Sequence, residues 1–297
     1  MGAYLSSPSL TKETSSGTCP NPTNKSSIVT WSATSMQGWR KTMEDAHITT
    51  TSCPSTSGTN DTMVFSVFDG HGGSEVALFC EKHFVEELVK RKGEKLQAAK
   101  RRGTGRQECL LPDHPVHAGC TSVVVVVNGT TITVANAGDS RAVMMRKDDE
   151  VFPLSYDHKP SDEIESTRIN GAGGFVNQFG RVNGNLNLSR SIGDLKYKQN
   201  VEVAREQQMI TAEPDLITVE MLPDDEFIVV GCDGIWDCLT NEECCQFVKT
   251  RIDEMTPAKI IEECLDTIVS EDPRATQGIG GDNMSLLLID LRSETRE

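Results

Sequence analysis

Long apolar segments are missing from this sequence of 297 residues. It has no run of 18 apolar residues, which excludes a membrane-spanning helix. It also does not open with the long apolar core of a secretory signal, so we expect a cytoplasmic protein. The length allows one large domain or two ordinary ones.

Positive charge is also scarce. The 29 Lys and Arg residues face 44 Asp and Glu residues, so the net charge at pH 7 is −15. A chain with this charge is not expected to bind the phosphate backbone of nucleic acids. Its overall field also repels anions, so an anionic substrate would have to be received by local cations or by a metal.

The ten cysteines lack the regular spacing of a disulfide framework, and only Cys244 and Cys245 are adjacent. This pattern favours reduced, mostly buried thiols over disulfides. The sequence carries no signal for oligomerisation either, and we expect a monomer.

Two segments bear on where the protein is found in the cell. Residues 1–6, MGAYLS, match the N-myristoylation pattern, which makes Gly2 a candidate lipidation site. A single acyl chain binds membranes weakly, so at most weak, reversible membrane association is expected. Residues 90–106 hold eight basic residues and one acidic residue. This stretch is best interpreted as a solvated helix end and loop, and the alternatives are nuclear targeting or docking of acidic partners.

The remaining pattern predicts an α+β domain. Residues 1–27 are rich in Ser, Thr and Pro and are predicted to form an irregular arm, followed by a single domain over 28–297. Asn128-Gly129 between two β-branched runs predicts a hairpin. Because strands are joined by hairpins and helices come in blocks, we expect antiparallel sheets covered by helices. Further strands are expected at 63–68, 226–232 and 284–291 and after the turn at 137–139, with helices at 74–91, 240–252 and 257–269.

Acidic residues recur where strands stop or glycines turn the chain. Any one of them is an ordinary turn residue. As a group, with glycine carbonyls and no nearby Cys or His set, they suit a hard cation such as Mg²⁺ or Mn²⁺. Two such ions would activate a water and hold a phosphoryl group. The residues concerned are Glu44, Asp45, Asp69, Asp139, Asp233 and Asp282.

Phosphate chemistry also needs a cation and an acid. Arg40 is a candidate for gripping phosphate, because a guanidinium binds phosphate oxygens bidentately. His71, two residues after Asp69, is a candidate for protonating the leaving group. On the residues alone, a plain turn histidine is the simpler interpretation of His71.

A series of short pieces runs in order along the chain between Trp31 and Asp290. They are RKTMEDAH (40–47), FDGHGG (68–73), NAGDSRAV (136–143), DHKP (157–160), RINGAGGFV (168–176), RVNGNLNLSRSIGD (181–194), CDGIWD (232–237) and GDNMS (281–285). Any one piece is weak, but the ordered set is highly specific, and it resembles the type 2C metal-dependent Ser/Thr protein phosphatases. The resemblance implies a four-layer α-β-β-α sandwich, with two central, mostly antiparallel sheets flanked by helices and a metal cleft at one end.

The resemblance also implies a Mg²⁺- or Mn²⁺-dependent enzyme that acts on phosphoserine and phosphothreonine proteins. Asp69 would bridge two ions. Glu44 and the carbonyl of Gly70 would complete the protein ligands of one ion, and Asp233 and Asp282 those of the other.

Other positions follow from the same resemblance. Arg40 would bind the substrate phosphate and His71 would protonate the departing oxygen. Asp139 would mark a weaker third metal position. The residues implied to lie nearby as supports are His47, Asp45, Asp194, Asp237 and Asn283.

The resemblance makes residues 168–184 a flap beside the cleft, where the sequence pattern itself indicates only a Gly-rich mobile loop. Between 91 and 121 the chain looks shorter and more basic than the usual helical pair of the family. Two other functions stay open. One is a non-catalytic scaffold on the same fold, although such a protein would usually have lost a metal carboxylate, and the other is a hydrolase of different phosphate esters.

Overall fold

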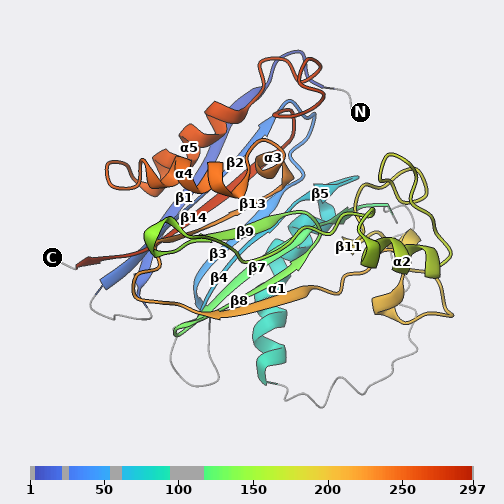
Figure 1. The fold of residues 1–297 in the computed structure, drawn as a ribbon, viewed down its shortest axis with the longest axis horizontal. Helices are drawn as coiled ribbons and strands as arrows, with labels where there is room; N and C mark the ends of the chain where they lie inside the picture. The colour runs from blue at the N-terminus through green and yellow to red at the C-terminus, as the bar shows by residue number, and fades with distance from the viewer. Residues whose placement is uncertain (1–3, 22–26, 54–61, 94–116, 296–297) are drawn as a thin grey trace.

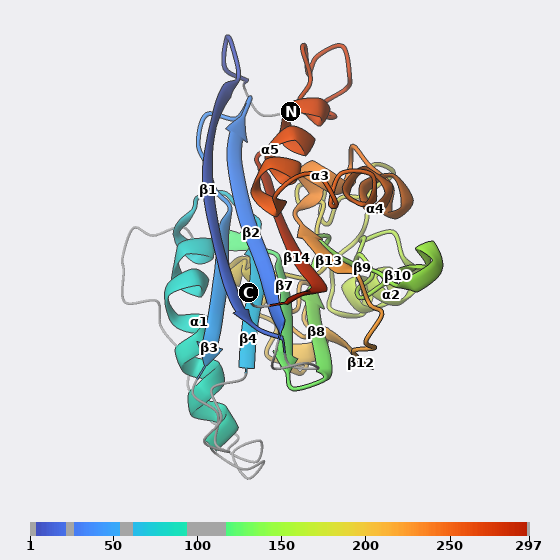
Figure 2. The same ribbon diagram turned by 90° about the vertical axis from the view of Figure 1, so that its left-hand side faces the viewer.

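The computed structural model describes residues 4–21, 27–53, 62–93 and 117–295. Two large β-sheets lie face to face, with α1 outside one of them and α4 and α5 outside the other (Figures 1 and 2). Every pair of neighbouring strands in the two large sheets is antiparallel. The predicted four-layer sandwich is therefore confirmed.

The first sheet has six strands. Its central strands β13 and β14 are buried on both faces, because helices cover one side and the second sheet covers the other. They match the apolar runs predicted at 226–232 and 284–291. In spatial order the strands are β1 (Ser9–Pro20), β2 (Ser27–Gly38), β14 (Met284–Thr295), β13 (Phe227–Gly231), β9 (Arg141–Met145) and β10 (Val151–Pro153).

The second sheet has five strands. The predicted hairpin joins β7 to β8, and Gly129 occupies its turn with φ +58°, a left-handed conformation that glycine adopts at little cost. In spatial order the strands are β12 (Asp215–Glu220), β8 (Thr131–Ala137), β7 (Ser122–Asn128), β4 (Thr62–Phe68) and β3 (Ala46–Cys53). A small third sheet contains β11 (Ile192–Gly193), β6 (Gly119–Cys120) and β5 (Gly70–His71).

The helices begin where the sequence places their caps. Thr240 forms a capping box with Glu243 at the start of α4, and the Thr256 hydroxyl accepts a hydrogen bond from the Lys259 amide at the start of α5. The α-helices are α1 (Glu75–Gly93), α2 (Glu163–Gly171), α3 (Asp233–Trp236), α4 (Asn241–Lys249) and α5 (Pro257–Ile268). Short 3₁₀ turns form η2 (Lys147–Asp149), η3 (Leu195–Tyr197) and η4 (Arg205–Gln207).

The predicted irregular arm at 1–27 is wrong for much of its length. Residues 9–20 form β1, which pairs with β2 along nearly its whole length. The strand escaped the sequence analysis because it is an edge strand in which Cys19 is the one buried position, so it shows no apolar alternation. Ser and Thr are compatible with such a half-exposed strand.

The flap is more ordered than the Gly-rich loop that the pattern indicates. Helix α2 forms its first part, and a small apolar cluster of Ile169, Val182, Tyr197 and Ile210 supports the rest. The carboxylate of Glu165 makes an ion pair at 2.7 Å with Arg168 inside α2, and a second at 2.7 Å with Arg190 connects the helix to the chain beyond the flap.

Some predictions fall on residues outside the described ranges. Gly2 is one of them, and so is the basic stretch from residue 94 to residue 106. The predicted difference from the family's helical pair at 91–121 also falls largely on residues outside the described ranges, namely 94–116. Within the described residues, no helix combines the length and apolar character needed to cross a membrane.

The two large sheets meet through aromatic packing that also constrains β1. Trp31 of β2 makes an edge contact with Phe65 of β4, with ring centroids 6.1 Å apart. Gly17 of β1 lies directly opposite Trp31, and a Cβ atom there would lie 2.5 Å from the Trp31 ring. A larger residue at position 17 must therefore push Trp31 against Phe65.

We expect Gly17→Ala to lower the free energy of unfolding by about 1–3 kcal/mol, as overpacking usually does. Urea denaturation measures the change. Ser15→Ala, at an exposed position two residues earlier in the same strand, should change stability by less than about 0.5 kcal/mol. Equal effects of the two substitutions would contradict the β1–β2 register.

Candidate active site

The two large sheets end together at a cleft with a volume of about 480 Å³. The segments that line it come from both sheets, from the N-terminal segment and from residues 181–188. Asp45, which the sequence analysis groups with the acidic residues, does not line the cleft. Every residue to which the resemblance assigns metal binding or catalysis does: Arg40, Glu44, Asp69, Gly70, His71, Asp139, Asp233 and Asp282.

Two carboxylates reach the cleft from the six-stranded sheet. Asp233 follows the end of β13, and Asp282 precedes the start of β14. Because these neighbouring strands are antiparallel, with Gly231 opposite Leu286, the end of one lies beside the start of the other. The two carboxylates therefore meet at the same end of the sheet.

The same geometry operates in the five-stranded sheet. Asp69 directly follows β4, and Glu44 precedes β3. These strands are also antiparallel neighbours, with Phe68 opposite Ala46. The facing sheets thus bring four acidic side chains, two from each, to one end of the sandwich.

Glycine allows these loops to approach one another closely. A Cβ atom on Gly70 would collide with the carbonyl oxygen of Glu44, and one on Gly234 would collide with the carbonyl oxygen of Asn283. Gly70 also pairs with Cys120 of β6, which fixes its backbone at the cleft wall. A larger residue at position 70 would separate Glu44 from Asp69.

The carboxylates repel one another. Burial, and then the negative charge of Asp233, raises the pKa of Asp69 well above its ordinary value. Burial, followed by the charges of Asp139 and Asp282, does the same for the pKa of Asp233. Without a cation to balance their charges, the ionised carboxylates repel one another, and the fold holds them close together despite this repulsion.

The donors in the cleft fit hard divalent cations. Asp139 is 2% exposed, and its Oδ1 atom has no hydrogen-bond partner among the described residues. Its Oδ2 atom accepts a hydrogen bond from Lys159 Nζ at 2.8 Å. Carboxylate and backbone carbonyl oxygens are the ligands that Mg²⁺ and Mn²⁺ prefer.

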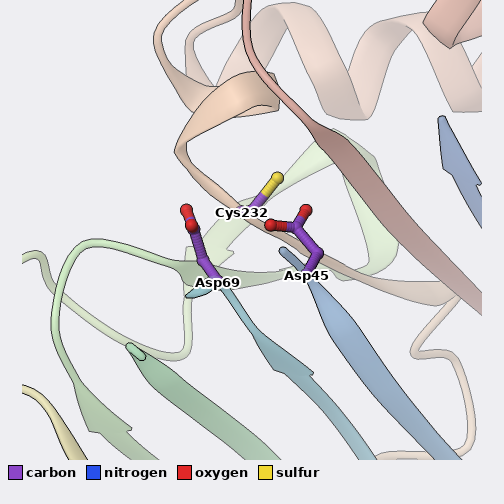
Figure 3. Close-up of side chains that lie close together, drawn as sticks. All are labelled: Asp45, Asp69 and Cys232. Carbon is purple, nitrogen blue, oxygen red and sulfur yellow. The ribbon is translucent and has the colours of Figure 1, made fainter. Parts of the chain in front are cut away.

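Behind the cleft, oxygen and sulfur atoms of Asp45, Asp69 and Cys232 lie within 4.8 Å of one another (Figure 3). The Cys232 thiol donates to the carbonyl of Asn283 at 3.5 Å and accepts the Ser285 amide at 3.2 Å, and burial raises its pKa well above its ordinary value. Asp45 accepts a hydrogen bond from Ser285 Oγ at 2.7 Å, and burial raises its pKa to about 7. The charge of Asp45 in turn raises the pKa of Asp69.

Arg40 lies at the rim of the cleft, with 45% of its side chain exposed. Its guanidinium pairs with Asp282. Burial opposes its charge, but attraction and hydrogen bonding to Asp282 outweigh this and raise the pKa of Arg40. The group stays cationic and accessible beside the metal ligands.

His71 is oriented by a buried carboxylate. Its Nε2 atom lies 2.7 Å from Oδ2 of Asp194, which is 1% exposed. Ser191 Oγ donates to the same oxygen at 2.6 Å. The Nδ1 atom of His71 is buried and has no hydrogen-bond partner among the described residues, so the hydrogen bond that the ring makes with them is the one between Nε2 and Asp194.

The other predicted supports differ in position. The Asn283 side chain accepts a hydrogen bond from the Glu44 amide at 3.0 Å and donates to the carbonyls of Gln37 and Thr42. Asp237 lies one helical turn after Asp233, and burial raises its pKa. His47 is absent from the cleft lining. It lies in β3 near Glu13 of β1, whose charge partly offsets the lowering of its pKa by burial.

Sequence reasoning missed several residues of the cleft. Thr121 brackets Asp69, donating its amide to the Asp69 carbonyl at 2.9 Å and accepting the Asp69 amide on Oγ1 at 3.2 Å. Arg181, and Lys159 that pairs with Asp139, could have been found, because they lie in the RVNGNLNLSRSIGD and DHKP pieces. Tyr4 gave no signal, since only the fold brings it to the cleft.

Comparisons with known proteins agree with this geometry. A family model described as Protein phosphatase 2C matches residues 29–274. "Probable protein phosphatase 2C 3" of Paramecium tetraurelia is 41% identical over 315 aligned residues, covering 98% of this chain and 100% of the relative. "Protein phosphatase 2C homolog 3" of Schizosaccharomyces pombe is 41% identical over 302 residues, covering 99% of this chain and 70% of the relative.

Solved structures share the fold. A phosphatase from a pathogenic strain of Toxoplasma gondii superimposes with a TM-score of 0.71 at 23% identity, covering 96% of this chain and 98% of that one. A serine-threonine phosphatase 2C from Toxoplasma gondii gives a TM-score of 0.68 at 19% identity, covering 94% and 99%. Since the family model spans most of the sequence and the relatives align over nearly all of it, the chain belongs to the protein phosphatase 2C family.

Proposed function

We propose that this chain hydrolyses phosphoserine and phosphothreonine in proteins by direct attack of water, using two Mg²⁺ or Mn²⁺ ions. The observation that carries the proposal is the meeting of Glu44, Asp69, Asp233 and Asp282 in one cleft. A non-catalytic scaffold lacks support, because no metal carboxylate is missing from this set.

The carboxylates divide naturally between two ions. Asp69, at the centre of the group, would be shared. Glu44 and the Gly70 carbonyl would bind one ion, and Asp233 and Asp282 the other. The ions would supply a water of lowered pKa as nucleophile and would stabilise charge on the phosphoryl group.

Arg40 would hold the phosphate of the substrate. Its position at the open rim leaves the guanidinium free to exchange part of its contact with Asp282 for phosphate oxygens. Bidentate contact would orient the phosphoryl group toward the carboxylates. Orienting the reacting groups before the chemical step is a large part of the catalytic effect in phosphoryl transfer.

His71 would protonate the departing Ser or Thr oxygen. Asp194 holds the imidazole through Nε2 and so fixes the orientation of the ring, which lines the cleft. Imidazole is the side chain best suited to proton transfer near neutral pH. Asp139, with its unpartnered oxygen, would hold a weaker third ion.

Phosphate release from a phosphothreonine peptide, with added Mn²⁺ or with chelator, tests the function. The wild-type protein should release phosphate only with metal, and Asp69→Asn should lower the rate by about 100-fold or more through lost metal ligation. Asp224→Asn, an exposed carboxylate paired with Lys147, is the matched control and should keep the wild-type rate.

Three outcomes of this assay would contradict the proposal. Near-normal activity of Asp69→Asn would remove the metal assignment. Release from small phosphate esters alone would indicate a different hydrolase on the same fold. No release by folded protein that binds Mn²⁺ would indicate a scaffold.

The role of His71 is tested by the choice of leaving group. His71→Ala should lower turnover of an alkyl phosphate by about 10²–10⁴-fold, because the poor leaving group needs the proton. Hydrolysis of an aryl phosphate should fall far less. His83→Ala, a histidine of α1 that packs on Phe79, should leave both rates unchanged. Equal losses on both substrates would exclude His71 as the acid.

Raised carboxylate pKa values predict how stability depends on pH. In the folded protein without metal, Asp45 keeps a proton that the unfolded chain releases, since its pKa is about 7 when folded. Stability is therefore lost as the pH rises from the ordinary carboxyl range to about 7. Divalent ions replace these protons, so Mn²⁺ should stabilise more at high pH.

Thermal unfolding at about pH 5 and about pH 8, with chelator or with Mn²⁺, measures this effect. The melting temperature with chelator should be lower at the higher pH, and Mn²⁺ should remove the difference. Asp45→Asn should reduce the dependence on pH. A chelated protein with the same melting temperature at both pH values would contradict the assignment of buried, repelling carboxylates.

A further inference from the structure

Tyr4 is a cleft residue to which neither the sequence motifs nor the proposed chemistry gives a role. It lines the cleft together with Arg40 and Asp282. The segment is held in place, because the amide of the next residue, Leu5, donates to the carbonyl of Trp39 at 2.9 Å. The N-terminal segment is thus attached to the backbone directly before Arg40.

The Tyr4 ring packs on the loop that leads to Asp282. A Cβ atom on Gly278 would lie 3.2 Å from the Tyr4 hydroxyl oxygen, and one on Gly281 would lie 3.3 Å from its ring carbon Cε1. The ring therefore occupies the space over these two glycines. Figures 1 and 2 both show the N-terminal segment beside the loop that joins α5 to β14.

The same loop is tied to the turn that carries Arg40. Trp39 Nε1 donates to the carbonyl of Ser270 at 2.8 Å, and the Ser270 amide donates to the carbonyl of Gly280 at 2.9 Å. Three chain segments cross here: residues 4–5, residues 38–40 and residues 270–282. Arg40 and Asp282 are paired at this crossing.

We infer that Tyr4 is a positioning residue for the phosphate-binding side of the active site. Its ring holds the Gly278–Asp282 loop against the Arg40 turn, which fixes Asp282 for metal and Arg40 for phosphate. The inference rests on the proposed function, because it assigns Asp282 to a metal and Arg40 to the substrate. As a positioning residue, Tyr4 would contact neither the departing oxygen of the substrate nor His71.

Substitution of Tyr4 should therefore weaken binding more than it slows the chemical step. Tyr4→Ala should raise three quantities by about tenfold, as loss of a residue that orients metal ligands typically does. These are the Kd for Mn²⁺ measured by calorimetry, the KM for a phosphothreonine peptide, and the inhibition constant of inorganic phosphate. The kcat at saturating Mn²⁺ and peptide should stay within about threefold of wild type.

Two variants and a control separate packing from other causes. Tyr4→Phe keeps the ring and should restore all three wild-type values. Tyr4→Leu keeps an apolar side chain and serves if Tyr4→Ala melts before it can be assayed. Tyr156→Ala removes a tyrosine that is 65% exposed and lies outside the cleft lining, and it should change none of the values.

Wild-type Mn²⁺ and phosphate affinities in Tyr4→Ala would overturn the inference. So would a fall in kcat with unchanged KM and unchanged Mn²⁺ affinity. Failure of the proposed function looks different, because wild-type protein would then bind Mn²⁺ without releasing phosphate. In that case the calorimetric titration alone still decides whether Tyr4 positions Asp282.

Discussion

Repulsion among buried carboxylates is the constraint on which this structure depends. Burial raises the pKa of Asp69 and of Asp233, the charge of Asp233 raises that of Asp69 further, and the charges of Asp139 and Asp282 raise both. Such a group can persist only where the surrounding backbone holds it firmly. The two sheets provide that support, because each carboxylate lies within two residues of a strand end and each strand belongs to the packed core.

Neutral groups, more than cations, hold the carboxylates in place. Asn283, Ser285 and Thr121 supply hydrogen bonds around them without cancelling their charge. Among the ion pairs of the described residues, two cations pair with carboxylates of the cleft, Arg40 with Asp282 and Lys159 with Asp139. The centre of the cleft therefore keeps a strong preference for divalent ions, although the chain as a whole repels its anionic substrate.

Local signals made much of this architecture predictable from the sequence. The Asn128-Gly129 turn, the caps at Thr240 and Thr256, and the acidic residues at strand ends each depend on neighbours in the chain. The strand β1, the apolar cluster of the flap and the position of Tyr4 depend on residues far away in the sequence, and no local pattern reveals them. The nearness of His47 to Glu13 of β1 has the same origin, since a motif fixes order along the chain but not which way a strand residue faces.

The position of β14 in the sheet has a consequence for folding during synthesis. This strand lies between β2 and β13, although its residues come some 250 positions after those of β2 in the sequence. Chains emerge from the ribosome N-terminus first, so β2 cannot pair with β14 until the roughly 250 residues between the two strands have been made. Asp282 arrives with that strand. A nascent chain therefore exposes an unpaired edge of β2 until β14 emerges, and only then does it hold all four carboxylates that the two large sheets bring to the cleft.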